Sequence, residues 1–145
     1  MSPQNVEKAR AFYPSRPINL AATFSEGDVA SRLAEEFDEV FHRDFETVDP
    51  TGTVTARSLR GMSGYVEGFR EWFSSWESWE VVAEDFIESG DKVLVVLEVT
   101  GRSRSDVEIS QRAANVLTFR DGRVARVEIH LDLDAARRAA GVEPG

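Results

Sequence analysis

The sequence has no cysteine and only two histidines, which sets several kinds of chemistry aside at once. Without cysteine there is no disulfide, no thiolate nucleophile and no cysteine-ligated zinc site. Two histidines do not make a convincing metal cluster. We therefore expect neither a metal nor a cofactor.

A cluster of lysine or arginine residues is missing as well. The chain has 26 acidic and 17 basic residues and a formal net charge of −9. Binding to nucleic acid depends largely on basic groups that contact phosphates, and anionic membrane surfaces attract the same groups. We therefore expect no nucleic-acid partner and no membrane partner.

Long apolar runs are also lacking. No stretch approaches the roughly 20 apolar residues of a membrane-spanning helix, and the N-terminus lacks a signal-peptide pattern. This predicts a cytoplasmic protein. The composition that is present, 41% apolar and 30% charged over 145 residues, is typical of a globular chain. We predict a single domain over residues 1–145.

The predicted elements place helices before strands. Apolar spacing, caps and prolines predict helices at 5–13, from Pro17, at 25–41, at 64–75 and at 134–140. Alternating runs predict strands at 45–48, 79–87, 92–102, 107–119 and 123–132, with an extended segment at 54–62. Helices followed by four consecutive antiparallel strands indicate an α+β fold, with helices laid on one side of a curved sheet.

Asp121-Gly122 lies between two strand-like runs and is a strong hairpin signal. With a two-residue loop, the strands would pair as Phe119–Val124, Leu117–Arg126, Asn115–Glu128 and Ala113–His130. Asn115 and Glu128 would then share one face. Binary patterning instead turns Val127 and Ile129 towards the core. Placing Asn115 inward as well needs a β-bulge that shifts the register.

Four segments resemble the SnoaL-like branch of the NTF2-like superfamily, which includes ketosteroid isomerases, polyketide cyclases and epoxide hydrolases. They are FHRDFETVDP at 41–50, the helix at 61–76, FIESGDKVLVVLEVTGRSR at 86–104, and LTFRDGRVARVEIHLD at 117–132 with its helix to Val142. The resemblance implies a cone: N-terminal helices packed on a curved, mainly antiparallel sheet around an apolar pocket.

The resemblance also implies a catalytic set. Ketosteroid isomerases take their general base from an Asp-Pro pair after the first strand, the place of Asp49-Pro50 here. An acid on their penultimate strand holds the oxyanion, and Asn115 stands at about that position, where its amide can donate a hydrogen bond. Their oxyanion tyrosine is replaced by Leu20. The alternative for Asp49 is that Asp-Pro simply ends a strand and turns the chain.

His130 has two interpretations. Facing inward, between Glu128 and Asp132, it would be an imidazole tuned for proton transfer. Facing outward, it would lie in solvent or in a dimer interface, which the apolar pattern of Val127 and Ile129 favours.

The remaining predicted site residues contact a ligand rather than react with it. The heavy aromatic face of the helix at 64–75 would roof the pocket, so we expect Tyr65, Trp72 and Trp76, together with Phe86, to form its wall. Arg112 either clamps an anionic group of a ligand or forms a structural ion pair, the commoner use.

Two functions from different classes fit these residues. In the first, an apolar or aromatic small molecule loses a proton next to a carbonyl, in an isomerisation, a cyclisation or a dehydration without a cofactor. Asp49 would be the base, and Asn115 with His130 or Arg112 would stabilise the enolate. In the second, the chain is a non-catalytic ligand-binding or dimerisation module. For both, we expect a homodimer formed through the sheet.

Overall fold

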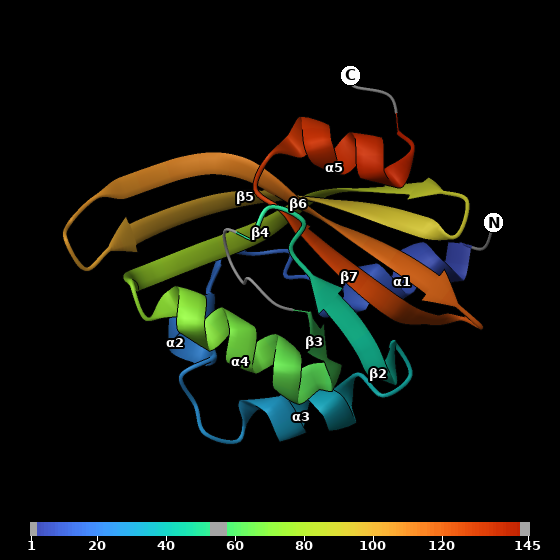
Figure 1. Cartoon of the computed structure of the whole chain (residues 1–145), viewed down its shortest axis with the longest axis horizontal. Coiled ribbons are helices and arrows are strands. Elements are labelled where there is room, and N and C mark those ends of the chain that lie inside the picture. The colour runs from blue at the N-terminus through green and yellow to red at the C-terminus, as the bar shows by residue number, and fades with distance from the viewer. Residues whose placement is uncertain (1–2, 53–57, 143–145) are drawn as a thin grey trace.

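The structure, a computed structural model, describes residues 3–52 and 58–142 and contains five helices and seven strands over those ranges (Figure 1). The helices are α1 (Pro3–Phe12), α2 (Leu20–Thr23), α3 (Val29–Glu36), α4 (Gly61–Phe73) and α5 (Leu133–Ala140). The strands are β1 (Ile18–Asn19), β2 (Phe41–Val48), β3 (Leu59–Arg60), β4 (Trp76–Ser89), β5 (Lys92–Ser103), β6 (Glu108–Arg120) and β7 (Arg123–His130).

The strands form one sheet in the order β1-β4-β5-β6-β7-β2-β3. The predicted antiparallel run of β4 to β7 is confirmed, while β2 lies parallel to β7 at one side. Helices α2, α3 and α4 lie on one side of the sheet and α5 lies on the other (Figure 1). We call the side that carries α2, α3 and α4 the inner face and the side under α5 the outer face. The predicted α+β architecture is confirmed.

The β6–β7 hairpin turns at Asp121-Gly122, as predicted. Both residues have positive φ, 53° and 79°, and Gly122 accepts this value without strain. Phe119 pairs with Val124 as expected, but the predicted pairs beyond it are wrong. Thr118 pairs with Arg126, so Ala125 is an extra residue in β7 and every later pair moves by one.

This β-bulge decides which side chains of β7 are turned inward. Leu117 pairs with Val127 and Asn115 pairs with Ile129, and the three apolar members of these pairs belong to the core on the inner face. Without this shift in register, alternation would have sent Val127 and Ile129 outward. Burying those two side chains is the physical reason for the shifted register.

Glu84 forms a second bulge, in β4. Ala83 pairs with Leu97 and Asp85 pairs with Val96, so Glu84 is left without a partner strand residue. A bulge bends its strand and increases the local twist. The bulges in β4 and β7 therefore help to curve the sheet around the inner face.

The helix predicted for 25–41 is shorter in the structure. It begins at Val29 and ends at Glu36, whereas Phe41 starts β2. The backbone N–H of Val124 donates to the carbonyl of Val40 at 2.8 Å, and Phe41 pairs with Val124, so sheet pairing overrides the helical pattern here. The helix predicted from Pro17 begins instead at Leu20. Of the extended segment predicted at 54–62, residues 54–57 lie outside the described residues.

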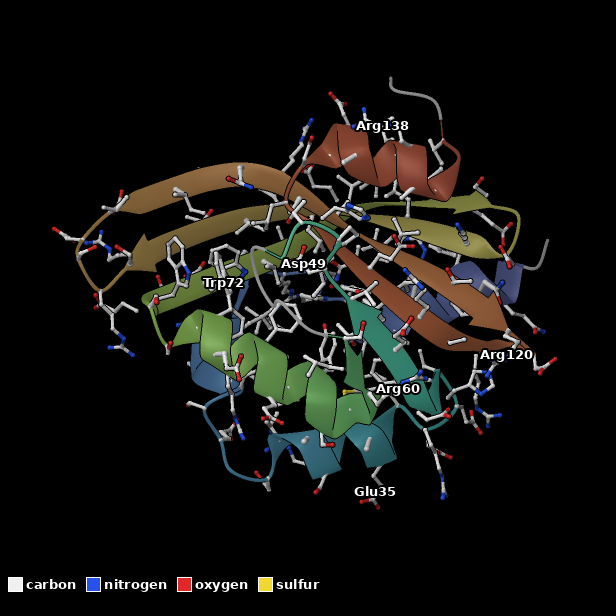
Figure 2. All side chains as sticks on the ribbon, viewed as in Figure 1. Glu35, Asp49, Arg60, Trp72, Arg120 and Arg138 are labelled. Atoms are coloured by element: carbon white, nitrogen blue, oxygen red, sulfur yellow. The ribbon has the colours of Figure 1, made fainter. Side chains whose placement is uncertain are left out.

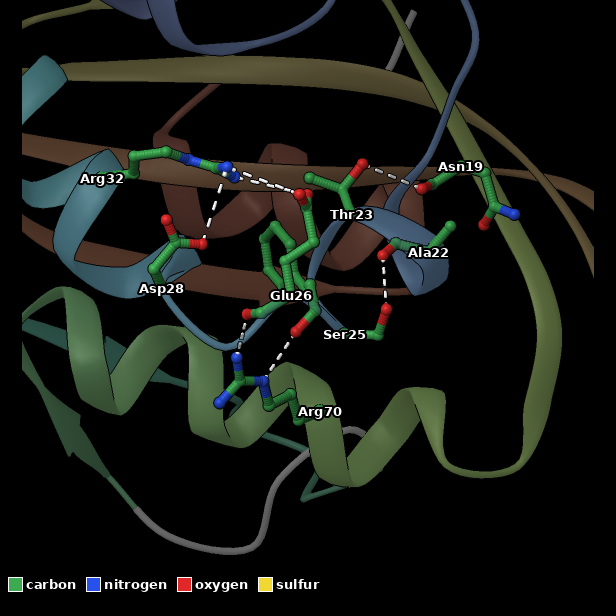
Figure 3. A network of polar contacts seen from close by, with 9 residues as sticks. Asn19, Ala22, Thr23, Ser25, Glu26, Asp28, Arg32 and Arg70 are labelled. Carbon is green, nitrogen blue, oxygen red and sulfur yellow. Dashed lines mark hydrogen bonds and ion pairs between the residues drawn. The ribbon is translucent and has the colours of Figure 1, made fainter.

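Arg70 of α4 fixes the loop between α2 and α3 (Figure 3). Its Nε donates to the carbonyl of Phe24 at 2.6 Å, and its Nη2 donates to the carbonyl of Glu26. Glu26 also pairs with Arg32, at 3.4 Å. These contacts attach α2 to α4, and both helices contribute to the inner face.

The outer face has its own apolar cluster. Leu94, Val96, Ala114 and Val116 of the sheet are buried with Ala136 and Ala140 of α5. This helix therefore covers an apolar part of the face that a second copy would need, and the homodimer through the sheet stays a prediction. Among the described residues, no helix is long and apolar enough to cross a bilayer.

Candidate functional site

A cavity of about 540 Å³ lies between the inner face and the helices. Its lining is mainly aromatic and aliphatic and draws on α1, α2, α3, α4 and the strands β4 to β7. The aromatic lining residues are Phe12, Tyr13, Phe24, Phe37, Tyr65, Phe69, Trp72 and Trp79. A hollow of this size and composition can hold a small organic molecule.

One buried hydrogen bond crosses this apolar lining. Asn115 Nδ2 donates to the hydroxyl oxygen of Tyr13 at 2.8 Å, and both residues line the cavity. They are 6% and 7% exposed, so each has lost its water. Burial raises the pKa of the Tyr13 phenol, and the bond from Asn115 lowers it in smaller measure. Tyr13 therefore keeps its proton at neutral pH.

The Tyr13 proton points to a use for this pair. Within residues 3–52 and 58–142, no acceptor takes a hydrogen bond from the Tyr13 hydroxyl. The arrangement leaves a polarised O–H donor inside an apolar hollow. Such a donor can bind a ligand oxygen and can stabilise negative charge that develops on it.

Two further polar groups lie in the same lining. Burial, followed by the electrostatic influence of Tyr13, raises the pKa of the Tyr65 phenol, so Tyr65 is a second protonated hydroxyl. Trp72 of α4 also lines the cavity, and its indole Nε1 is buried without a hydrogen-bond partner among the described residues (Figure 2). The predicted positions of Tyr65 and Trp72 beside a hollow agree with this geometry.

Asp49 follows the last residue of β2 directly. Its Oδ1 accepts from the backbone N–H of Thr51 at 3.1 Å and from the Thr51 hydroxyl at 2.9 Å. This is a turn in which an aspartate side chain closes its own loop. Asp49 is not one of the described residues that line the cavity, so its role as a base stays a prediction.

Three other predicted contact residues also lie outside the cavity lining, as far as the chain is described. Arg112 is exposed and its Nε lies 3.2 Å from Glu84 Oε1, which is the structural ion pair of the two alternatives. Trp76 packs against Trp79, with ring centroids 4.8 Å apart. Phe86 lies under the guanidinium of Arg10, 4.7 Å from ring centroid to Cζ.

His130 ends β7 and borders the cavity, but its ring belongs to the outer face. It pairs with Ala114, a member of the outer cluster, and its Nε2 lies 3.5 Å from Oε1 of Glu128, two residues earlier on the same face. The ring is 5% exposed, so it is covered rather than solvated. This placement agrees with the outward alternative, and a catalytic role for His130 stays a prediction.

Tyr13 was not among the predicted site residues, although its hydroxyl is long enough to reach a pocket. The signal available was the spacing of Ala9 and Tyr13, one helical turn apart, which predicts that both face the same buried side. Both are indeed buried. Spacing does not say that α1 packs over β4 and β5, and that packing brings the hydroxyl to Asn115.

Within the described ranges, no group of three metal-ligating side chains is gathered.

A model of the SnoaL-like domain family matches residues 19–127. The chain belongs to this family. The SnoaL-like match begins after Tyr13 and ends before His130, so two of the polar residues at the cavity come from outside the matched segment. A comparison with curated proteins gives no match.

Solved structures share the fold over nearly the whole SnoaL-like chain. A putative SnoaL-like polyketide cyclase from Jannaschia sp. CCS1 is 19% identical, with a TM-score of 0.67 over 99% of this chain and 98% of that one. TerC, co-crystallised with polyporic acid, is 21% identical, with a TM-score of 0.64 over 95% and 98%. A de novo designed protein with a curved β-sheet is 13% identical, with a TM-score of 0.56 over 95% and 96%. These likenesses establish the NTF2-like cone and leave the activity open.

Proposed function

We propose that this SnoaL-like protein binds an apolar or aromatic small molecule whose carbonyl or phenolic oxygen accepts a hydrogen bond from Tyr13. The observation that carries the proposal is the chain from Asn115 to the Tyr13 hydroxyl inside the cavity. Burying two polar residues costs free energy, and their mutual bond offsets only part of it. A ligand oxygen would complete the set of hydrogen bonds.

The same donor suits cofactor-independent chemistry next to a carbonyl. When a proton leaves the carbon beside a carbonyl, negative charge moves to the oxygen. A preorganised donor in a dry site then stabilises the transition state more than the ground state. Isomerisation, aldol-type cyclisation and dehydration all pass through such an enolate. Tyr65 lines the same cavity and keeps its proton, so its hydroxyl can add a second hydrogen bond to that oxygen.

The relatives support a small organic ligand. TerC was co-crystallised with polyporic acid, and the protein from Jannaschia sp. CCS1 is described as a putative polyketide cyclase. A non-catalytic module that only holds its ligand uses the same cavity and the same donor. The two functions differ in whether the bound ketone exchanges its α-protons.

A ketone and its hydrocarbon counterpart test the binding step. We expect 1-tetralone to bind the wild-type protein more tightly than tetralin, measured by quenching of tryptophan fluorescence, because only the ketone accepts from Tyr13. Tyr13→Phe should lower the affinity for the ketone by roughly two- to tenfold, which corresponds to the loss of one neutral hydrogen bond. The affinity for tetralin should stay unchanged. Thr100→Val, which removes an exposed hydroxyl from β5, is the control. Equal affinities for ketone and hydrocarbon would contradict the proposal.

The same ketone separates an enzyme from a binding module. Exchange of the α-protons of 1-tetralone in D₂O, followed by NMR, should be faster with the wild-type protein than in buffer. Tyr13→Phe should slow this exchange by about 10²-fold, as for loss of an oxyanion donor. Asp49→Asn in the same assay tests the predicted base: an unchanged rate removes Asp49 from the mechanism. Exchange no faster than in buffer leaves the binding module.

A further inference from the structure

Three residues with charged side chains belong to the cavity lining. They are Arg10 on α1, Arg16 on the segment between α1 and β1, and Glu36 at the end of α3. All three are exposed, whereas Tyr13 and Asn115 are buried, so these three lie where the cavity lining reaches solvent. Two arginines stand here against one glutamate, although the whole chain carries a net charge of −9.

The segment that carries Arg16 is attached at both sides. The backbone N–H of Ala83 donates to the carbonyl of Pro14 at 2.8 Å, and Ile18 pairs with Val81 in the sheet. Pro17 fixes one further backbone dihedral between these two points. The backbone of Arg16 is therefore held in place beside the cavity, so ligand binding does not require the conformational entropy cost of ordering this segment.

The two guanidinium groups are differently engaged. Among the described residues, none makes an ion pair or a hydrogen bond with Arg16. Arg10 stacks on Phe86 and lies 3.9 Å from Glu7, in a pair whose side chains are both more than half exposed. Such an exposed ion pair contributes little free energy, so it leaves Arg10 able to bind another anion. Arg16 is therefore the freer of the two cations for an anionic group, and Arg10 is a second positive charge in the same lining.

We propose that the ligand of this protein is an organic anion, with its apolar body in the cavity and an acidic group such as a carboxylate or sulfonate held by Arg16 and Arg10. This assignment rests on the proposed function for the placement of the body. A guanidinium donates two parallel hydrogen bonds to such a group, so charge and geometry both favour an oxyacid. The buried donor Tyr13 and the exposed cation Arg16 would then contact two separate parts of the same ligand.

Two fluorescent dyes with nearly the same apolar body test the assignment: anionic 1-anilinonaphthalene-8-sulfonate and uncharged N-phenyl-1-naphthylamine. Arg16→Gln should lower the affinity for the sulfonate dye by about three- to tenfold, a range that allows for solvent screening. The affinity for the uncharged dye should stay unchanged. Adding Arg10→Gln should lower the affinity for the sulfonate dye further. Arg138→Gln removes the same charge from α5, on the other side of the sheet, and is the matched control (Figure 2).

The outcomes separate the two proposals. A loss of sulfonate binding that is specific to Arg16→Gln, and that shrinks at high salt, supports the anion site. Equal losses in Arg16→Gln and Arg138→Gln, or equal losses for both dyes, overturn it while the cavity still binds the uncharged body. If the sulfonate does not bind the wild-type protein, the anion site is overturned, and the titration with 1-tetralone decides the proposed function separately.

Discussion

The two faces of the central strands are both apolar, yet only one of them leaves a hollow. On the outer face, small side chains such as Ala114 meet the alanines of α5, so the helix approaches closely and fills the space. On the inner face, the opposing wall is built from bulky aromatic residues on other helices, and the curved sheet leaves about 540 Å³ between them. Apolar patterning predicts burial on both faces, but only the partner of each face decides whether the space is filled.

The buried polar groups differ between the faces in the same way. Asn115, on the inner face, has a partner in Tyr13 at 2.8 Å. His130, on the outer face, has two ring nitrogens without a hydrogen-bond partner among the described residues. Its closest charged neighbour is Glu128, at 3.5 Å. The hydrogen-bonded pair of Asn115 and Tyr13 therefore lies beside the hollow, together with the unpartnered indole N–H of Trp72.

Leucine truncation on one strand gives the largest contrast between the faces. Leu94→Ala empties a fully buried place under α5 and should cost about 2–5 kcal/mol of unfolding free energy. Leu97→Ala widens an existing hollow, so the protein loses the transfer free energy of the side chain without gaining a new closed void. Its loss of unfolding free energy should therefore be at or below the lower end of that range. Urea unfolding measures both values, and equal costs would show that the inner face is packed as tightly as the outer one.

Enlarging neighbouring alanines gives the opposite contrast. Ala114→Leu overpacks the sheet against α5 and should destabilise the protein by about 1–3 kcal/mol. Ala113→Leu extends into the cavity and should change the unfolding free energy little, while lowering the affinity for 1-tetralone. Urea unfolding and fluorescence titration of the two variants check this. A large loss of stability in Ala113→Leu would mean that the hollow is already filled.

The smallest expected effect is a change in how the unfolding free energy depends on pH, caused by the buried phenols of the inner face. Burial raises the pKa of Tyr13, and of Tyr65, above the value near 10 of an unfolded tyrosine. The folded state then holds these protons more tightly, so the stabilisation is complete below that value and is lost as the pH rises above it. Unfolding free energies from about pH 9 to about pH 11 should decline less steeply in Tyr13→Phe, by roughly 1 kcal/mol over the range. Parallel slopes would contradict the burial.

Local sequence signals were enough for most of the sheet. The Asp121-Gly122 turn, the alternation in β5 and the Gly141 end of α5 are short-range features, and the structure has all three. The end of α3 was not predictable in this way. The helical pattern continues to Phe41, but pairing with Val124, far along the chain, draws that residue into β2.

The candidate site was less predictable than the fold because its parts are distant in sequence. Asn115 was predicted from the resemblance to ketosteroid isomerases, whereas its partner Tyr13 is 102 residues away and its position depends on how α1 packs. Asp49 was chosen from an Asp-Pro motif, and a motif does not fix the direction of a side chain in a loop. Arg10 and Arg16 form no pattern in the sequence, and only the structure shows that both line the cavity.

The extra residue at Ala125 has a consequence for how this hairpin can vary. On the turn side of Ala125, the even-numbered Val124 faces the core, and beyond it the odd-numbered Val127 and Ile129 do. Deleting one residue on the turn side of Val127 would therefore remove the bulge, and regular alternation would still bring Val127 and Ile129 to the core. An inserted residue would need a second bulge, so this hairpin should tolerate the loss of one residue more readily than the gain of one.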